Sequence, residues 1–226
     1  DTNTLASIAN EFQGKNLNAV VAIATPAAQS VAKLANKTPV IFSAVSDPIG
    51  AKLTSSLTHP NKNMTGTSDE VQVDQILEKA LEVQPKLKKI GLLYNKGEAN
   101  SVTNIKNAKA YLLKKNIQVE EAAVSSVNEV QSAVNVLSSK CEAIFSPNDN
   151  TVASAMAAAG KAAIKAKIPF YTGADSMVKD GGFLTVGIDY EELGKETARM
   201  TDQILKGKKI SELPVKVFKT DLNIYV

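Results

Sequence analysis

Apolar residues along the chain follow two alternating patterns. Short continuous runs such as AVVAIA (19–24) and KIGLLY (89–94) predict buried β-strands, whereas apolar residues three or four positions apart, as in 101–115 and 190–206, predict helices. Further strands are expected at 39–45, 117–124, 142–146, 168–172, 183–188 and 215–220, and further helices near the N-terminus and at 27–36, 72–84, 127–139 and 150–166. Helices that separate consecutive strands indicate right-handed crossover units in a parallel sheet.

The strands are continuous apolar runs, which is typical of sheets covered on both faces. A segment rich in Pro, Asn and Gly, residues 46–66, separates two blocks of crossover units and is expected to be a loop. The pattern therefore predicts an α/β protein with two Rossmann-like lobes, each built on a parallel sheet.

Small polar residues follow five of the expected strands, where ligands of open parallel sheets bind. These clusters are TPAAQ (25–29), SDP (46–48), YNKGEANS (94–101), PNDNT (147–151) and GADS (173–176). Helix capping by Thr25, by Asn100 or Ser101, and by Asn150 is an alternative for each residue. The two interpretations are compatible, since the amides of a helix N-terminus also bind carboxylates, and the small residues at 25–28 allow close approach.

The clusters do not fit a phosphate. No G-x-x-x-x-G-K-[ST] or G-x-G-x-x-G motif follows a strand, and Glu98 and Asp149 would repel an anion. Carboxylates at strand ends suit an ammonium group instead. A helix N-terminus on one lobe and carboxylates on the other together favour an α-amino acid as the ligand.

The amino-acid composition argues against several classes of function. The net charge is +3, and Arg199 is the one arginine among 26 basic residues, so nucleic-acid recognition is disfavoured. The chain has a single histidine, His59, and a single cysteine, Cys141, which excludes metal sites built on several such residues. Cys141 is best interpreted as an inert buried thiol. No cofactor motif occurs, so no cofactor and no enzymatic activity are expected; a hydrolase using Glu98, Asp149 and Asp175 is the disfavoured alternative.

Several segments resemble one bacterial family. AIATPAAQS, FSAVSDPIGAKL, NMTGTSD, GLLYNKGEANS, SPNDNTVASAM and VGIDYEELGKETARM are similar, block after block, to the substrate-binding proteins of an ABC-transporter family whose ligands include tryptophan and other aromatic amino acids. The resemblance implies a type I periplasmic-binding fold that closes about a hinge around its ligand, with no catalysis. It also implies an exported protein, either a lipid-anchored lipoprotein on a Gram-positive surface or a periplasmic protein, that delivers its ligand to permease subunits.

The resemblance also implies domain bounds and a site. The first lobe would comprise 1–67 and 189–208, and the second 68–188 and 209–226. First-lobe residues expected to contact the carboxylate or side chain of the ligand are Thr25, Ala27, Ala28, Ser43 and Ser46. Second-lobe residues expected to contact its amino group or close the cleft are Asp69, Asn95, Glu98, Asn100, Ser101, Asp149, Asn150 and Asp175. Among the acids, Asp149 is the first choice for the ammonium, followed by Asp175 and Glu98.

Two further expectations follow from the resemblance. Family members carry about one more strand–helix–strand before the position of Asp1, so an N-terminal unit of the first lobe is expected to be missing from this sequence, and a shortened chain is favoured over a naturally shorter protein. The effector-sensing domain of a transcription regulator shares this architecture and is the alternative function. It would require a helix-turn-helix region upstream.

Overall fold

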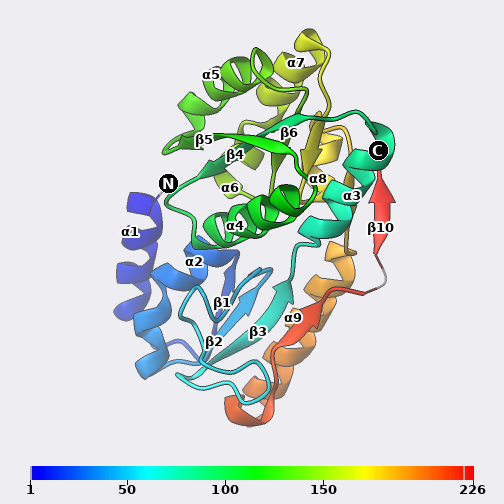
Figure 1. The fold of residues 1–226 in the computed structure, drawn as a ribbon. Helices are drawn as coiled ribbons and strands as arrows, with labels where there is room; N and C mark the ends of the chain where they lie inside the picture. The colour runs from blue at the N-terminus through cyan, green and yellow to red at the C-terminus, as the bar shows by residue number, and fades with distance from the viewer. Residues whose placement is uncertain (1, 221) are drawn as a thin grey trace. The chain divides into compact units, whose positions relative to one another are not determined.

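A computed structural model describes residues 2–220 and 222–226. The chain divides into two compact units (Figure 1): unit 1 contains residues 2–70 and Asp189–Thr220, and unit 2 contains Val71–Ile188 and residues 222–226. The chain therefore passes between the units at three points, after Glu70, after Ile188 and after Thr220. Each unit is a helix-covered parallel sheet, as the sequence predicted.

Unit 1 is built on a four-stranded parallel sheet in the order β1-β2-β3-β9. Its strands are β1 (Val20–Ile23), β2 (Val40–Ser43), β3 (Met64–Asp69) and β9 (Lys216–Phe218). Its helices are α1 (Thr2–Gln13), α2 (Thr25–Ser30), η1 (Ala32–Asn36), α9 (Tyr190–Leu205) and η2 (Ile210–Glu212).

Alternating side chains of β2 face the two layers that cover this sheet. Val40 and Phe42 pack into a core formed with α1, α2 and η1, whereas Ile41 packs against Met200 and Ile204 of α9. All four residues of β2 are buried, which explains why the strand is an uninterrupted apolar run.

Unit 2 contains a second four-stranded parallel sheet, in the order β5-β4-β6-β7, and an antiparallel pair of β8 and β10. Its strands are β4 (Lys89–Asn95), β5 (Gln118–Val124), β6 (Ala143–Ser146), β7 (Phe170–Thr172), β8 (Thr185–Gly187) and β10 (Asn223–Tyr225). Its helices are α3 (Val73–Val83), α4 (Ala99–Lys114), α5 (Val127–Ser138), α6 (Asn150–Ser154), α7 (Met156–Ala166) and α8 (Asp175–Lys179).

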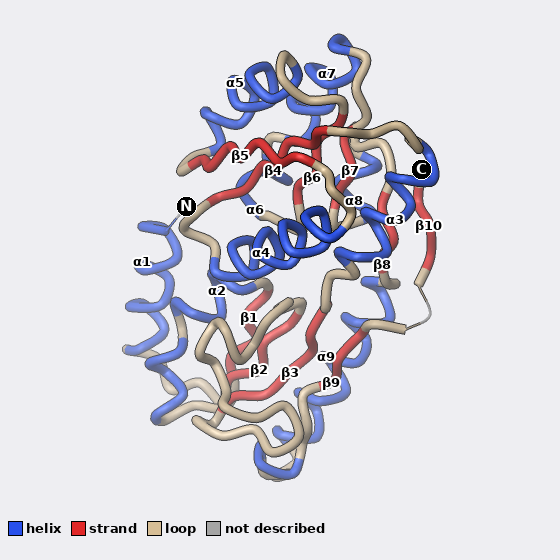
Figure 2. Tube along the Cα trace, in the orientation of Figure 1, coloured by secondary structure: helices blue, strands red, loops and turns tan. Residues whose placement is uncertain are grey.

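Helices cover both faces of the unit 2 sheet, as the tube view shows (Figure 2). Ile90 and Leu92 of β4 pack into a core with α3 and α4 on one face. Gly91, between them, points the other way, and a Cβ there would lie 3.0 Å from Leu137 of α5. The absence of a side chain at Gly91 thus lets α5 approach β4 closely.

Several predicted elements differ from the structure. The segment 64–69, expected to belong to a loop and a crossover, forms the buried strand β3, and the single helices expected at 27–36 and 150–166 are each two helices, the second pair separated at Ala155. Residues 209–220, expected in the second lobe, belong to unit 1 because β9 pairs with β3 there.

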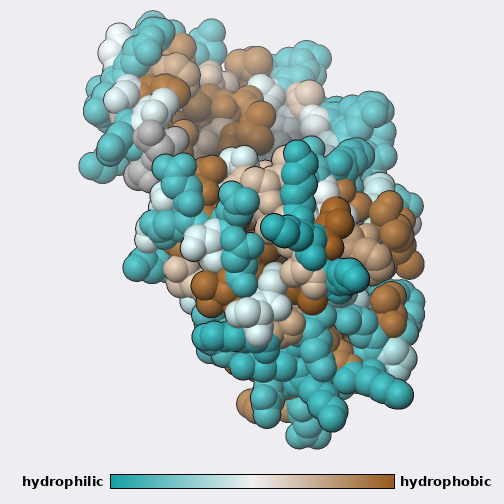
Figure 3. Space-filling model, turned by 90° about the horizontal axis from the view of Figure 1, so that it is seen from above, coloured by the Kyte–Doolittle hydropathy of each residue, from teal (hydrophilic) through white to brown (hydrophobic). Residues whose placement is uncertain are grey.

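Figure 3 shows one face of the molecular surface. In the view of Figure 3, hydrophilic side chains cover much of the visible face and apolar residues form separate patches. Individual apolar side chains, among them Ile23, Leu113 and Ile164, are well exposed. Across the described ranges, no helix combines the length and apolar character needed to cross a membrane.

Candidate functional site

Glu98 lies between the end of β4 and the start of α4, but its side chain accepts hydrogen bonds from the first residues of another helix, α6. One carboxylate oxygen accepts hydrogen bonds from the backbone amide (3.0 Å) and side-chain amide (2.7 Å) of Asn150. The other accepts from the backbone amide and the hydroxyl of Thr151, both at 2.9 Å. Glu98 therefore satisfies the first turn of α6, where backbone amides have no intrahelical partner.

Asp149 joins the same turn to β4. Its side chain accepts from the amide of Val152 at 2.9 Å, as the N-cap of α6, and from the amide of Asn95 at 2.6 Å. The residue is completely buried. Asp149 rather than the expected Asn150 is thus the cap, and its carboxylate ties the end of one strand to the helix that follows the next.

The electrostatics of Asp149 reflect this burial. Burial raises the pKa of its carboxyl, and repulsion from Glu98 raises it further, while the hydrogen bonds from the Asn95 and Val152 amides act in the opposite direction. The native state therefore binds the Asp149 proton more tightly than the unfolded chain does.

The free energy of unfolding should depend on pH in a way that reflects the raised pKa of Asp149. Because the native pKa is raised, the part of the Asp149 contribution to stability that depends on its proton is fully present below its ordinary pKa of about 4 and is lost as pH rises through the native value, whereas its hydrogen bonds to the two backbone amides remain. We expect the difference in unfolding free energy between wild type and Asp149→Asn to shrink as pH rises above about 4. Urea denaturation followed by circular dichroism measures it. A difference that grows with pH would mean that the native pKa is lowered.

The remaining predicted residues of unit 2 gather around this pair. The side-chain amide of Asn95 donates to the Thr151 hydroxyl at 2.7 Å, and that of Asn100 donates to the Asn148 carbonyl at 3.2 Å. Asn100 and Ser101 are buried inside the first turn of α4 rather than capping it, because the helix begins at Ala99. This group of residues therefore forms one hydrogen-bonded cluster at the carboxyl ends of β4 and β6.

Asp175 lies three residues after the end of β7 and differs from the other acids. It is the first residue of α8, its side chain is 16% exposed, and it forms an ion pair with Lys179 at 2.7 Å. Sequence reasoning did not anticipate the short helix that brings this lysine one turn away.

In unit 1, the predicted turn after β1 has an unusual backbone. Ala24, the N-cap of α2, has φ 69° and ψ 161°, a conformation that costs a non-glycine residue about 1–3 kcal/mol. Thr25, expected to cap α2, instead lies inside its first turn and is buried, as is Ala28, whereas Ala27 is half-buried. Strain of this kind clusters at functional sites, and here it shapes the segment predicted to meet a carboxylate.

Hydroxyl groups form two hydrogen-bond networks near the carboxyl ends of β2 and β3. Ser43 shares a hydrogen bond with Thr197 of α9 at 2.9 Å, and Thr197 shares another with Thr67 at 2.8 Å, so the Ser43 hydroxyl anchors α9. Asp69, buried at the end of β3, accepts from Ser46 at 3.0 Å and from Tyr190 at 2.9 Å.

Asp69 was assigned to the second lobe by sequence, but the structure places it in unit 1. Sequence reasoning also missed Tyr190, which reaches Asp69 from the start of α9, 121 positions along the chain. The sequence offered one indication of this role: Tyr190 directly follows Asp189, the residue that caps α9.

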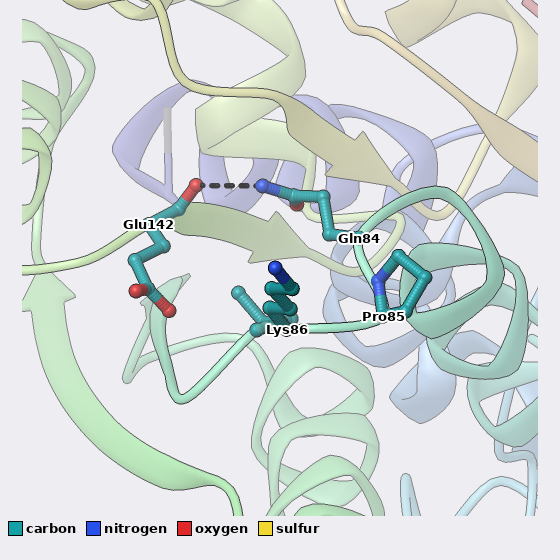
Figure 4. A pocket seen from close by; sticks show the side chains of 5 residues that line it. Gln84, Pro85, Lys86 and Glu142 are labelled. Atoms are coloured by element: carbon teal, nitrogen blue, oxygen red, sulfur yellow. Dashed lines mark hydrogen bonds between the residues drawn. The ribbon is translucent and has the colours of Figure 1, made fainter.

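A surface pocket of 420 Å³ lies elsewhere in unit 2 (Figure 4). Gln84, Pro85, Lys86, Leu87 and Glu142 line it, and the Gln84 side chain donates to the Glu142 carbonyl at 3.2 Å. These residues precede β4 and β6, so the pocket is at the amino ends of the strands, opposite the polar cluster. Within residues 2–220 and 222–226, no group of three or more His, Cys, Asp or Glu is arranged to hold a metal ion.

Two helix-covered parallel sheets joined by three chain crossings, with polar residues at the carboxyl ends of the strands, define a ligand-binding protein of the type I periplasmic-binding class. Residues 1–224 match the family of ABC transporter substrate binding proteins. The chain belongs to that family.

Known relatives agree with this assignment. The chain is 36% identical to the tyrosine-binding protein of Clostridioides difficile over 95% of its own length, and spans 62% of that relative. It is 41% identical, with a TM-score of 0.93, to the ABC domain of Streptococcus pneumoniae solved in complex with L-Trp; the match covers 97% of this chain and 75% of that one. The transcription regulator CcpA of Lactococcus lactis, at 14% identity and a TM-score of 0.67 over 100% and 83% of the two chains, shares the fold alone.

Proposed function

We propose that this protein is the substrate-binding component of an ABC importer and that its ligand is an aromatic amino acid. The observation that carries the proposal is the 41% identity, across nearly the whole chain, to a domain solved with L-Trp bound. The name of the C. difficile relative, a tyrosine-binding protein, supports the same ligand class. The transcription-regulator alternative has only distant similarity in fold behind it.

The polar clusters support an α-amino acid in particular. In the proposed site, the first turn of α2 and the residues after β2, including Ser46, meet the carboxylate or nearby side chain. The cluster at the ends of β4, β6 and β7, with the acids Glu98, Asp149 and Asp175, meets the ammonium group.

A binding role without catalysis fits this arrangement. The ligand would be handed intact to permease subunits outside the cytoplasm, where proteins of this family act, and a lipid anchor would hold the protein at the membrane. Chromatography of ligand recovered after long incubation checks the absence of turnover, because an enzyme would return a changed compound.

Isothermal titration calorimetry tests the ligand class directly. We expect Trp, Tyr or Phe to bind the purified protein with a dissociation constant on the order of 1 μM, equivalent to about −8 kcal/mol. Alanine, which lacks the ring, and N-acetyltryptophan, which lacks the ammonium, are the matched controls and should bind far more weakly. No heat from any of the three aromatic amino acids would contradict the proposal.

A further inference from the structure

Lysines gather at the end of the unit 1 sheet where its strands begin. Helix α9 starts beside the carboxyl end of β3, where Tyr190 donates to Asp69, and runs back along the sheet, so the turn after Leu205 lies near the amino ends of the strands. At that end, Thr65 of β3 donates to the Leu213 carbonyl at 2.7 Å. Figure 1 shows the turn after α9 at the same end of unit 1 as the loop that precedes β3.

A surface cavity of about 420 Å³ lies between this turn and this loop. Its polar lining includes Asn61 and Asn63 from the loop and Lys208 and Lys209 from the turn. Lys62 stands between the two asparagines in the sequence. Side chains that donate hydrogen bonds or carry positive charge therefore come together here from segments more than a hundred positions apart.

Neighbouring segments add further lysines. The side chain of Lys62 donates to the Lys52 carbonyl at 3.0 Å, and that of Asn63 donates to the Ala35 carbonyl at 3.0 Å, two positions before Lys37. We call the resulting surface the lysine face. It consists of six exposed residues: Lys37, Lys52, Lys62, Lys206, Lys208 and Lys209.

Few acids balance these charges. Lys206 pairs with Asp202 at 2.8 Å, but none of the other five lysines forms an ion pair with any residue in 2–220 and 222–226. Glu212 is the one acid in the segments 36–39, 52–63 and 203–213. Most acids of unit 1 lie instead at the carboxyl ends of the strands, after β2, at the end of β3 and at the start of α9: Asp47, Asp69, Glu70, Asp189, Glu191 and Glu192. Unit 1 therefore carries opposite charge at its two ends, which gives it a directional electrostatic field.

We propose that the lysine face docks unit 1 on an anionic membrane surface, where its ammonium groups contact the phosphates of lipid headgroups. The inference goes beyond ligand binding. It rests on the proposed delivery of the ligand to permease subunits, since a protein with that role works beside a membrane, and it says which end of unit 1 meets that membrane.

The lysine face fits lipid headgroups better than it fits other anions. Its six lysines are exposed and come from three segments, so their charges are spread over a surface and do not converge on one buried group. Such a surface suits many phosphates at once. The segments 36–39, 52–63 and 203–213 contain no Arg, Phe, Tyr or Trp, so they offer a nucleic acid neither forked contacts nor ring stacking.

Co-sedimentation with lipid vesicles tests the docking. The wild-type protein should bind vesicles that contain phosphatidylglycerol and should not bind vesicles of phosphatidylcholine alone. Binding should be lost at about 1 M salt, where the Debye length is about 3 Å. The triple variant Lys62→Gln, Lys208→Gln, Lys209→Gln should partition about 100-fold more weakly, because each lysine near an anionic surface contributes about fivefold.

Three lysines of unit 2 provide the matched control. Lys161, Lys165 and Lys167 lie in or directly after α7 and are exposed. Replacing all three with Gln removes the same net charge as the first triple variant, but from a surface outside the lysine face. The partition coefficient should therefore stay close to that of the wild type.

Four results would overturn the docking: no preference of the wild type for phosphatidylglycerol, undiminished binding at high salt, equal losses in the two triple variants, or displacement from vesicles by millimolar inorganic phosphate at constant ionic strength. The last result would show that the cavity holds free phosphate. Calorimetry of both triple variants with L-Trp, L-Tyr and L-Phe separates this proposal from the proposed function. Loss of vesicle binding with unchanged amino-acid affinity supports the docking, whereas vesicle binding by a wild-type protein that binds no amino acid would overturn the proposed ligand alone.

Discussion

Replacing Asp149 with alanine should lower the free energy of unfolding by about 3–4 kcal/mol. The carboxylate is completely buried and accepts from the amides of Asn95 and Val152. Alanine would leave both amides in the interior without an acceptor, at about 1–3 kcal/mol each. Relief of the unfavourable burial and of the repulsion from Glu98, which together raise the Asp149 pKa, offsets part of this loss.

Urea denaturation of the wild type and Asp149→Ala at neutral pH measures the effect. Asp189→Ala is the matched control: Asp189 also caps a helix, α9, by accepting from the amides of Glu191 and Glu192, but it is exposed. Water can replace an exposed cap, so we expect a loss of only about 1 kcal/mol. Equal losses in the two variants would show that burial adds nothing to the role of Asp149.

Gly66→Ala should destabilise unit 1 by about 4 kcal/mol. Gly66 lies in β3 opposite Phe42 of β2, with φ 156°, and a Cβ there would lie 1.8 Å from the Phe42 carbonyl oxygen. That distance is far inside van der Waals contact, so the two central strands would have to separate. Their parallel pairing supports the whole sheet, because β1 and β9 flank them.

Thermal and chemical unfolding of Gly66→Ala can be compared with Gly194→Ala. Gly194 lies within α9 of the same unit, and a Cβ there meets nothing within 4 Å. Alanine favours a helix by about 0.8–1 kcal/mol over glycine, so this variant should be slightly more stable than the wild type. If Gly66→Ala is as stable as Gly194→Ala, then β2 and β3 can accommodate a side chain at this position.

The α/β class and most helices could be predicted from periodicity alone, but β3 could not. Its sequence, MTGTSD, is polar, whereas the other central strands are apolar. The strand is nevertheless fully buried, because its hydroxyls find partners inside the unit: Thr65 donates to the Leu213 carbonyl at 2.7 Å, and Thr67 meets Thr197. These partners lie far along the chain, so no local pattern indicates them.

The gathering of polar residues in unit 2 could be predicted from the sequence, but the contacts of their side chains could not. Residues at the ends of β4, β6 and β7 do gather, because parallel strands bring their carboxyl ends to one edge of the sheet. Sequence spacing could not show that Glu98 and Asp149 use their carboxylates on α6, nor that Lys179 lies beside Asp175. Those contacts depend on where α6 and α8 begin, and helix ends are set by tertiary capping partners.

Because the chain passes between the units three times, the two units can be completed at different times during synthesis. The residues of unit 2 from Val71 to Ile188 leave the ribosome as one continuous stretch, so its parallel sheet can assemble as soon as β7 has emerged. Unit 1 begins first but is completed later, because Ile41 stays uncovered until Met200 and Ile204 of α9 arrive, and β3 has no partner on its outer edge until β9 does. Unit 1 therefore stays incomplete for longer than unit 2 and is exposed to misassembly for longer.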